Sequence, residues 1–382
     1  MAIAVLYPRF DHPAIEERYA SWQTQMLLQA GGAALYFYDL DECARDIVKE
    51  IGEEHLLVVT DPILVPPAHL AARLLERLTD GAAAAVPVSN EAQNEQQKRA
   101  PAGLYLTLRE FQQMSAAMQS QPAPPRHVTW EGSDPAVFLC RTSLLAESKQ
   151  PISAVLAGRD VVISDNDYVH RWSSLRGQVR MDLLSRISPE AKSILEFGCG
   201  EAPLGEALKK RQKCRVIGIE LDPKAAAIAR RRIDDVYCGD VREIVSIIHE
   251  RFDWIVGGDI VEHLDEPWSF LAELRRIAAP GGYLLLSLPN IGNASLVADL
   301  LQGRFDYVYM GLTCVGHLRF FTRKTIEDML TIAGWSVAEI APQAAIPTPA
   351  TEALFAALEQ GGAPHSKQDL TAPGYYVIAR NS

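Results

Sequence analysis

Two histidines and two carboxylates in the second half of the chain have the side chains that proton transfer or metal binding requires. Asp259, Glu262 and His263 lie close together in the sequence, and His317 follows in the segment VGHLRFF. An imidazole titrates close to neutral pH, so His263 or His317 could act as the general base of a group transfer. The carboxylates of Asp259 and Glu262 with the imidazole of His263 could also hold a divalent cation. Each histidine could equally be a hydrogen-bonded structural residue.

A glycine-rich turn is the element that would position a cofactor for such chemistry. The stretch ILEFGCGEAPLG predicts a buried strand over Ile194–Phe197, a tight turn at Gly198 and Gly200, and then a helix to Lys210. Such a turn directs unpaired backbone N–H groups toward a ligand above the carboxyl end of the strand. Many α/β proteins use one only to pack a helix on a sheet, so neighbouring residues must decide its meaning.

Acidic residues stand at the ends of the next two expected strands. Glu220 follows the glycines by about twenty residues, where a carboxylate can accept hydrogen bonds from both hydroxyls of a ribose. Asp240 ends the following strand, where an acceptor can meet an exocyclic amino group such as that of adenine. Alternatively, both acids cap helix N-termini and the glycines only shape a turn. Glu220 and Asp240 together favour a nucleotide-like cofactor.

Strands and helices alternate from Ile194 onward, which predicts a doubly wound α/β sheet with its ligands at the carboxyl ends of the strands. Further strands are expected at 215–219, 236–237, 252–256 and 283–287, separated by helices at 223–233, 241–249 and 268–278. Residues 335–340 and 375–380 are expected to form an antiparallel hairpin. The insertion at 344–373 interrupts this hairpin and could be a lid or a homodimer contact.

The first part of the chain has an alternation of its own and predicts a smaller α/β domain over 1–150, with a largely parallel sheet. Its expected strands are 2–7, 33–38, 55–60, 83–88 and 136–140, and its expected helices are 15–29, 43–51, 67–78 and 104–118. Residues 151–188 are expected to be a connecting helical region, because Leu175, Val179, Leu183 and Leu184 have the spacing of one helix face. The second domain then spans 189–382.

The motifs of the second domain resemble those of class I S-adenosylmethionine-dependent methyltransferases over about residues 168–381. Six segments carry the resemblance in the family's order: ILEFGCG, VIGIELDP, VYCGDV, FDWIVGGDIVEHLDEPWSFL, AAPGGYLLLSLPN and HLRFFT. The resemblance implies a Rossmann-like seven-stranded sheet and S-adenosyl-L-methionine as the cofactor. The cofactor-binding positions that it implies are Glu196, Gly198, Gly200, Glu220, Leu221, Asp240, Val241, Gly258 and Asp259.

In family terms these positions divide among the parts of the cofactor. Glu196 and the two turn glycines would contact its amino acid part, Glu220 its ribose, and Asp240 with Val241 its adenine. Gly258 and Asp259 would border the sulfonium. One departure is Ala202, where many relatives have Gly; Ala is small enough for the cofactor to bind.

Two narrower resemblances concern the metal and the acceptor. The Asp259, Glu262 and His263 pattern resembles the Glu-x-x-Glu-His cluster of ubiquinone-pathway and small-RNA methyltransferases, which binds a divalent metal there; many relatives carry EHL without being metal enzymes. The run SLPNIGNASLVADLLQGRFDYVYMGLTCVGHLRFFT resembles a subgroup linked to surface-polysaccharide and glycosyltransferase genes. Acceptor contacts are then expected at Asn290, Tyr307, Tyr309 and Arg319, although Tyr and Arg often only pack and pair across loop surfaces.

The first 150 residues resemble the nucleotide-sugar domain of family 2 glycosyltransferases, a GT-A-like fold. The similar segments are HLLVVTDPILVPPAHLAARLLERL and DPAVFLCRTSLL. The family's metal-binding Asp-x-Asp appears here only as Asp61-Pro62-Ile63, and one carboxylate is a weak metal–phosphate site. A degenerate domain for binding or assembly is therefore expected.

Composition limits the classes of partner. The chain of 382 residues has 48% hydrophobic and 22% charged residues, as ordinary globular proteins do, and its net charge of −11 disfavours nucleic acid. Six scattered cysteines suggest neither a zinc ribbon nor a disulfide framework, which fits the cytoplasm. No apolar run approaches the roughly 20 residues of a membrane span, and the opening MAIAVLYPRFDHP resembles a strand more than an export signal.

The sequence therefore predicts a cytoplasmic S-adenosylmethionine-dependent methyltransferase that O-methylates a sugar, a glycan or a related polar small molecule. His263 or His317 is the expected base, and a divalent metal is not favoured. Two alternatives stay open: a bifunctional glycosyltransferase-methyltransferase, and a non-catalytic scaffold that the cofactor stabilises.

Overall fold

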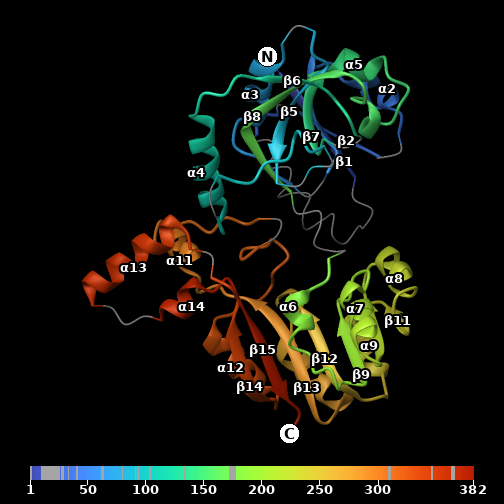
Figure 1. Cartoon of the computed structure of the whole chain (residues 1–382), viewed down its shortest axis with the longest axis vertical. Helices are drawn as coiled ribbons and strands as arrows, with labels where there is room; N and C mark the ends of the chain where they lie inside the picture. Colours follow the sequence, from blue (N-terminus) through green and yellow to red (C-terminus); the bar gives the residue numbers. More distant parts are fainter. Residues whose placement is uncertain are drawn as a thin grey trace. The chain divides into compact units, whose positions relative to one another are not determined.

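The computed structural model describes the chain apart from residues 1, 10–25, 27–29, 33, 40–41, 62–63, 80, 91, 93, 103–104, 133–134, 172–177, 309–310, 346 and 363–365. The chain divides into two compact units (Figure 1). One contains residues 1–173 with 306–310, and the other contains residues 174–305 with 311–382. The helix expected at 15–29 lies almost wholly outside the described residues.

The amino-terminal unit is built on an eight-stranded sheet in the order β2-β1-β3-β7-β5-β8-β4, with β6 paired to β8. Its strands are β1 (Ile3–Pro8), β2 (Ala34–Tyr38), β3 (His55–Val59), β4 (Leu64–Val65), β5 (Ala84–Ser89), β6 (Arg126–Thr129), β7 (Val137–Arg141) and β8 (Asp160–Arg171). Its helices include α2 (Ala44–Ile47), α3 (Leu70–Arg77), α4 (Leu108–Gln119) and α5 (Thr142–Ala146), with 3₁₀ turns η1 (Val48–Glu50) and η2 (Ile152–Ala154).

Two expectations, one for this unit and one for the region that follows it, are wrong. The sheet is mixed rather than largely parallel, because β7 runs antiparallel to both β3 and β5. A strand buried on both faces has the same apolar run in either direction, so its composition does not reveal its direction. Residues 151–188 are not a connecting helical region, because they contain the twelve-residue strand β8, and the only described α-helix among them is the short α6 (Met181–Leu184).

The carboxyl-terminal unit contains the expected seven-stranded Rossmann-like sheet, in the order β11-β10-β9-β12-β13-β15-β14. The first five strands along the chain are parallel, and β15 runs antiparallel to β13 and β14. The strands are β9 (Ser193–Phe197), β10 (Arg215–Glu220), β11 (Asp235–Cys238), β12 (Phe252–Gly258), β13 (Ala278–Pro289), β14 (Ser336–Pro342) and β15 (Gly374–Arg380). The strand order reverses between β9 and β12, so their carboxyl ends mark the expected ligand site.

Helices cover both faces of this sheet (Figure 1). One apolar core packs α9 (Val241–Ile247), α10 (Pro267–Ile277) and α12 (Arg323–Ile332) against the strands, and the other packs α6, α7 (Pro203–Arg211) and α8 (Pro223–Ala229). Prolines begin α7, α8 and α10, where the missing N–H has no helical partner to lose. α7 and α8 begin shortly after the carboxyl ends of β9 and β10, whereas the 3₁₀ turn η4 (Val261–His263) lies between β12 and α10.

The insertion between β14 and β15 contains α13 (Pro349–Gly361) and α14 (Lys367–Thr371). α13 packs against α11 (Ala294–Leu300), and buried hydroxyls of Ser295 and Thr348 lie 3.0 Å apart between them. The expected antiparallel pairing of β14 with β15 is confirmed. In the part of the chain that the structure describes, no helix is long and apolar enough to cross a membrane.

Candidate active site

The glycine turn after β9 adopts a backbone that favours glycine. Gly198 and Gly200 have φ values of 68° and 56°, in the left-handed region. A Cβ on Gly198 would lie 2.3 Å from Ile260 Cδ1, so a larger residue would require the Ile260 side chain to move. Ala202 also has a left-handed φ of 58°, which explains physically why glycine suits that position.

Glu220 joins the glycine turn to the start of α8. Its Oε2 accepts a hydrogen bond from Gly200 N at 2.7 Å, and its Oε1 accepts one from Asp222 N at 2.9 Å. The helix cap of α8 is Asp222, which accepts from Lys224 N, and not Glu220. Leu221, beside the carboxylate, is 55% exposed and offers an apolar surface.

Asp240 follows β11 and is the N-cap of α9, where it accepts a hydrogen bond from Arg242 N at 2.8 Å. Hydrogen bonding from the Arg242 side chain holds the pKa of Asp240 below its ordinary value. The capping alternative for this residue is therefore realised in the structure, and Val241 is the first residue of the helix. A cap does not exclude a ligand, because the N-terminus of a helix presents further N–H groups.

Glu196 is a buried carboxyl on β9 beneath the turn, only 8% exposed. Burial raises its pKa to about 8, and the charge of Glu220 contributes in the same direction. Its Oε2 makes no hydrogen bond among the described residues, and the backbone of Gly205 beside it only partly offsets the rise in pKa. An unsatisfied buried acceptor at the carboxyl end of a strand fits a cationic or N–H-bearing ligand group, such as the amino group of a cofactor.

The end of β12 carries an ion-pair network that the sequence did not predict. Asp259 has a left-handed φ of 56°. Its Oδ2 accepts a hydrogen bond from Arg180 Nη1 at 2.7 Å, and its Oδ1 accepts one from Ser287 Oγ at 2.8 Å. Arg180 also pairs with Asp182, whose Oδ2 accepts from Tyr376 at 2.9 Å. Arg180 and Ser287 are the functional candidates that sequence reasoning missed, because neither lies in a motif with Asp259.

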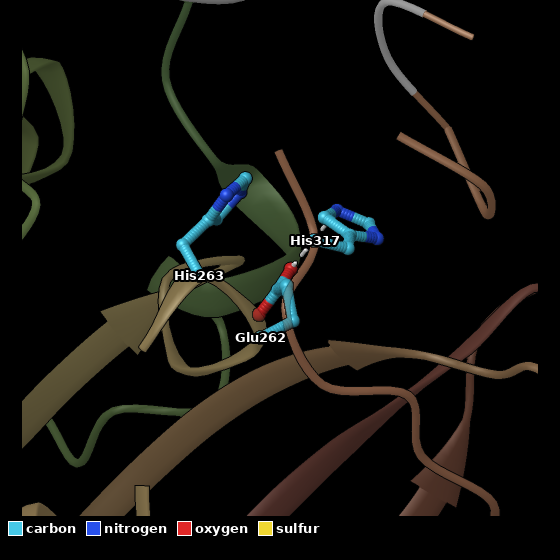
Figure 2. Close-up of side chains that lie close together, drawn as sticks. All are labelled: Glu262, His263 and His317. Atoms are coloured by element: carbon cyan, nitrogen blue, oxygen red, sulfur yellow. Dashed lines mark ion pairs between the residues drawn. The ribbon is translucent and has the colours of Figure 1, made fainter. Parts of the chain in front are cut away.

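Glu262, His263 and His317 form one cluster beside this network (Figure 2). Glu262 and His263 belong to the 3₁₀ turn η4 (Val261–His263) after β12, and His317 comes from a loop whose Leu318 and Arg319 amides both donate to the Glu262 carbonyl. His317 Nε2 lies 3.9 Å from Glu262 Oε1. The imidazole rings of His263 and His317 pack edge to face, with their centroids 4.9 Å apart. The structure therefore brings the two candidate bases, which the sequence named separately, together in one place.

Burial dominates the electrostatics of this cluster. It raises the pKa of Glu262, which is 1% exposed, well above its ordinary value, and the charge of Asp259 adds to the effect. It lowers the pKa of His317 to about 4, with a further contribution from His263. His263 Nδ1 lies 2.9 Å from the Gly316 carbonyl, so the proton is assigned to Nδ1 and the lone pair of the neutral ring to Nε2.

The cluster also fits a divalent cation. One carboxylate oxygen and one nitrogen from each histidine all lie within 4.8 Å of one another. Glu262 Oε2 is buried and has no hydrogen-bond partner among the described residues. A ring N–H bonded to a backbone carbonyl is the usual orientation of a metal-binding histidine, and His263 has this arrangement.

The expected acceptor residues are more dispersed. The Asn290 amide is 1% exposed and donates to the Asp369 and Ala372 carbonyls at 2.7 and 3.0 Å, so it holds the α14 segment. Arg319 donates to the Asp265 and Leu318 carbonyls. Tyr307 groups with the amino-terminal unit, and Tyr309 lies outside the described residues. Acceptor contacts by these four residues stay a prediction.

Comparison with known proteins shows which part of the chain is similar to them. Residues 171–340 match a family model described as a methyltransferase domain. A ubiquinone biosynthesis O-methyltransferase of Cereibacter sphaeroides is 23% identical over 173 residues, which cover 44% of this chain and 69% of that protein. A probable S-adenosylmethionine-dependent methyltransferase of Mycolicibacterium smegmatis is 34% identical over 148 residues, 38% of this chain and 52% of the relative. A solved SAM-dependent methyltransferase from Archaeoglobus fulgidus has a TM-score of 0.39 and 18% identity, and the alignment covers 53% of this chain and 91% of that one.

Proposed function

We propose that the protein O-methylates a sugar, a glycan or a related polar small molecule. The premise is that the carboxyl-terminal unit is a class I S-adenosylmethionine-dependent methyltransferase domain. S-adenosyl-L-methionine supplies a methyl group already activated by the positive charge on sulfur. The observation that carries the proposal is the convergence of Glu220, the glycine turn and the Glu262–His263–His317 cluster at one edge of one sheet. Relatives named as O-methyltransferases support oxygen as the acceptor atom.

The chain's own residues suit the parts of this cofactor. Glu196 would accept a hydrogen bond from the amino group of the cofactor. Gly198 and Gly200 would let the amino acid part of the cofactor approach the backbone. Glu220 would accept from the ribose hydroxyls, with the exposed Leu221 against the adenine, and Asp240 with Val241 would border its polar edge. Gly258 and Asp259 would stand nearest the sulfur.

His263 is the stronger candidate for the base. Its Nδ1–H is oriented by the Gly316 carbonyl, so Nε2 has the lone pair that would take a proton from an acceptor hydroxyl. His317, with its pKa lowered to about 4, is neutral and weakly basic at pH 7 and would orient the acceptor or its neighbours instead. Alignment of the acceptor with the methyl group then completes the requirements of the transfer.

A metal-assisted form of the same reaction is the second candidate, and the unpartnered Glu262 oxygen favours it. Glu262, His263 and His317 would hold the cation. A divalent cation there would lower the pKa of a coordinated acceptor hydroxyl. Mixed oxygen and nitrogen ligands suit Mn²⁺, Zn²⁺ or similar ions as well as Mg²⁺.

The amino-terminal unit, we propose, is a degenerate GT-A-like domain that binds or positions the acceptor. Asp61, at the place of a glycosyltransferase metal motif, is 6% exposed and pairs with the equally buried Arg171 at 2.8 Å. A carboxylate paired in this way is poorly suited to hold a metal–diphosphate, which argues against the bifunctional alternative. We place the protein in the cytoplasm because all six cysteines are free thiols. A homodimer through the 344–373 insertion stays a prediction.

Transfer of radiolabelled methyl from S-adenosylmethionine to a panel of nucleotide sugars and oligosaccharides tests the function. We expect His263→Ala to lower kcat by about 10²–10⁴-fold, because it removes the base. His249→Ala, which changes an exposed histidine just after α9, is the matched control and should leave kcat unchanged. Cofactor binding with no transfer to any acceptor would favour the scaffold instead.

A further inference from the structure

Arg180 forms ion pairs with Asp182 in α6 and with Asp259 after β12. Its Nη1 lies 2.7 Å from Asp259 Oδ2, and its Nη2 lies 2.8 Å from Asp182 Oδ2 and 3.2 Å from Ser287 Oγ. Because Ser287 Oγ donates to the other Asp259 oxygen at 2.8 Å, both oxygens of Asp259 are engaged. Asp259 is therefore held next to the Glu262 turn but outside the three-residue cluster that could hold a cation.

The cluster by itself supplies three protein ligands, which leave further coordination positions of a divalent cation open. Glu262 brings one carboxylate, and the two histidines bring neutral nitrogen atoms. Hard and borderline divalent cations commonly take further oxygen ligands. Asp259 stands three positions before Glu262, and its charge already acts on that residue. It can join the ligand set only if it leaves Arg180.

Arg180 also lies close to the proposed cofactor site, at the end of β12. A Cβ built on Gly258 would lie 3.2 Å from Arg180 Nη1, so the guanidinium lies against the end of β12. Its charge acts on Glu196, the carboxyl beneath the glycine turn. An arginine in this position is suited to a bidentate pair with a carboxylate. The α-carboxylate of S-adenosylmethionine is such a group.

We propose that Arg180 exchanges Asp259 for the carboxylate of the bound cofactor, and that the released Asp259 joins Glu262, His263 and His317 in a divalent-cation site. This inference rests on the proposed function. The exchange makes cofactor and cation bind cooperatively, and each strengthens the other by the same factor. Coupling between two sites is commonly about 5- to 150-fold, and we expect a value near tenfold here.

The test measures Mn²⁺ binding to the full-length protein by electron paramagnetic resonance of the free ion, which needs no turnover. Mn²⁺ is titrated into the protein without a ligand, with saturating S-adenosylhomocysteine, and with saturating 5′-methylthioadenosine. The first ligand has the carboxylate, and the second has the adenosine and thioether without the amino acid part. We expect S-adenosylhomocysteine to raise the Mn²⁺ affinity about tenfold and methylthioadenosine to change it less than twofold.

Two variants locate the coupling. In Arg180→Gln, Asp259 is released without a ligand, so Mn²⁺ should bind more tightly than to the wild type and S-adenosylhomocysteine should no longer change its affinity. In Asp259→Asn, Mn²⁺ should bind weakly in both states. Thermal unfolding shows whether each variant is folded, and the wild-type comparison of the two ligands stands without them.

The outcomes separate this inference from the function on which it rests. If S-adenosylhomocysteine binds but the Mn²⁺ affinity changes less than twofold, or if methylthioadenosine acts equally, the exchange is wrong and the cofactor site stands. Absence of Mn²⁺ binding in every state also overturns the exchange and removes the metal-assisted form. Absence of S-adenosylhomocysteine binding overturns the proposed cofactor site itself.

Discussion

Replacement of Glu196 by Gln should change how the stability of the carboxyl-terminal unit depends on pH. Burial raises the pKa of this carboxyl from its ordinary value of 4.5 to about 8. Between these values the folded protein keeps a proton that the unfolded chain releases, so the free energy of unfolding falls as pH rises. The contribution is fully present below pH 4.5 and is lost by about pH 8.

The magnitude follows from that difference. At 1.36 kcal/mol per pKa unit, the contribution of Glu196 to the free energy of unfolding falls by about 5 kcal/mol from low to high pH. About 3 kcal/mol of this fall lies between pH 5.5 and 8.5. For a domain of this size, about 3 kcal/mol corresponds to roughly 6–12 °C in Tm. Gln has nearly the same shape and does not titrate, so Glu196→Gln should lack this part of the pH dependence.

The assay is thermal unfolding of both proteins at pH 5.5, 6.5, 7.5 and 8.5, at constant ionic strength and without cofactor. Other titrating groups are common to the two proteins, so the difference in Tm between them isolates Glu196. We expect the wild type to lose stability relative to the variant at each step. A constant difference in Tm across this range would refute the assignment of a neutral, buried Glu196.

Three further changes test other parts of the account. Glu220→Gln removes the charge that accepts from Gly200 N and Asp222 N, and it should weaken S-adenosylhomocysteine binding about 10- to 100-fold by calorimetry, whereas Asp222→Asn, which keeps the helix cap, should change it less than about threefold. Gly257→Ala would put a Cβ 2.0 Å from the Phe197 ring and should lower Tm by about 2–12 °C; an unchanged Tm would show that this contact can relax freely. Asp61→Ala removes the buried ion-pair partner of Arg171 and should destabilise the amino-terminal unit by about 3–5 kcal/mol in urea unfolding, whereas Asp61→Ala with Arg171→Met should recover most of the loss.

The fold of the carboxyl-terminal unit was predictable because its strands are apolar and its turns have strong signals. Gly198 illustrates this: its neighbours in sequence indicate a turn, and the structure adds that Ile260 leaves no room for a side chain. The strand β8 illustrates the opposite case. Its polar run contains Asp167, which is fully buried and pairs with Arg73 at 2.6 Å, so a segment that reads as exposed is a strand.

The candidate site was predictable where a residue stands at or just after a strand end, as Glu220 and Asp240 do. Arg180 could not be found in this way, because it lies 79 positions from Asp259 and no periodic pattern connects them. The clustering of Glu262 with His317 also depends on a loop whose course is fixed by backbone hydrogen bonds to the Glu262 carbonyl. Such contacts follow from tertiary packing and have no local sequence signal.

The central claim is that the glycine turn and Glu220 form the binding site of S-adenosylmethionine. Calorimetric titration of the full-length protein with S-adenosylhomocysteine, with Glu220→Gln in parallel, tests it most directly. The account predicts one site per chain in the wild type and a loss of at least tenfold in affinity in the variant. Equal affinity in the two proteins, or no binding to the folded wild type, would contradict it.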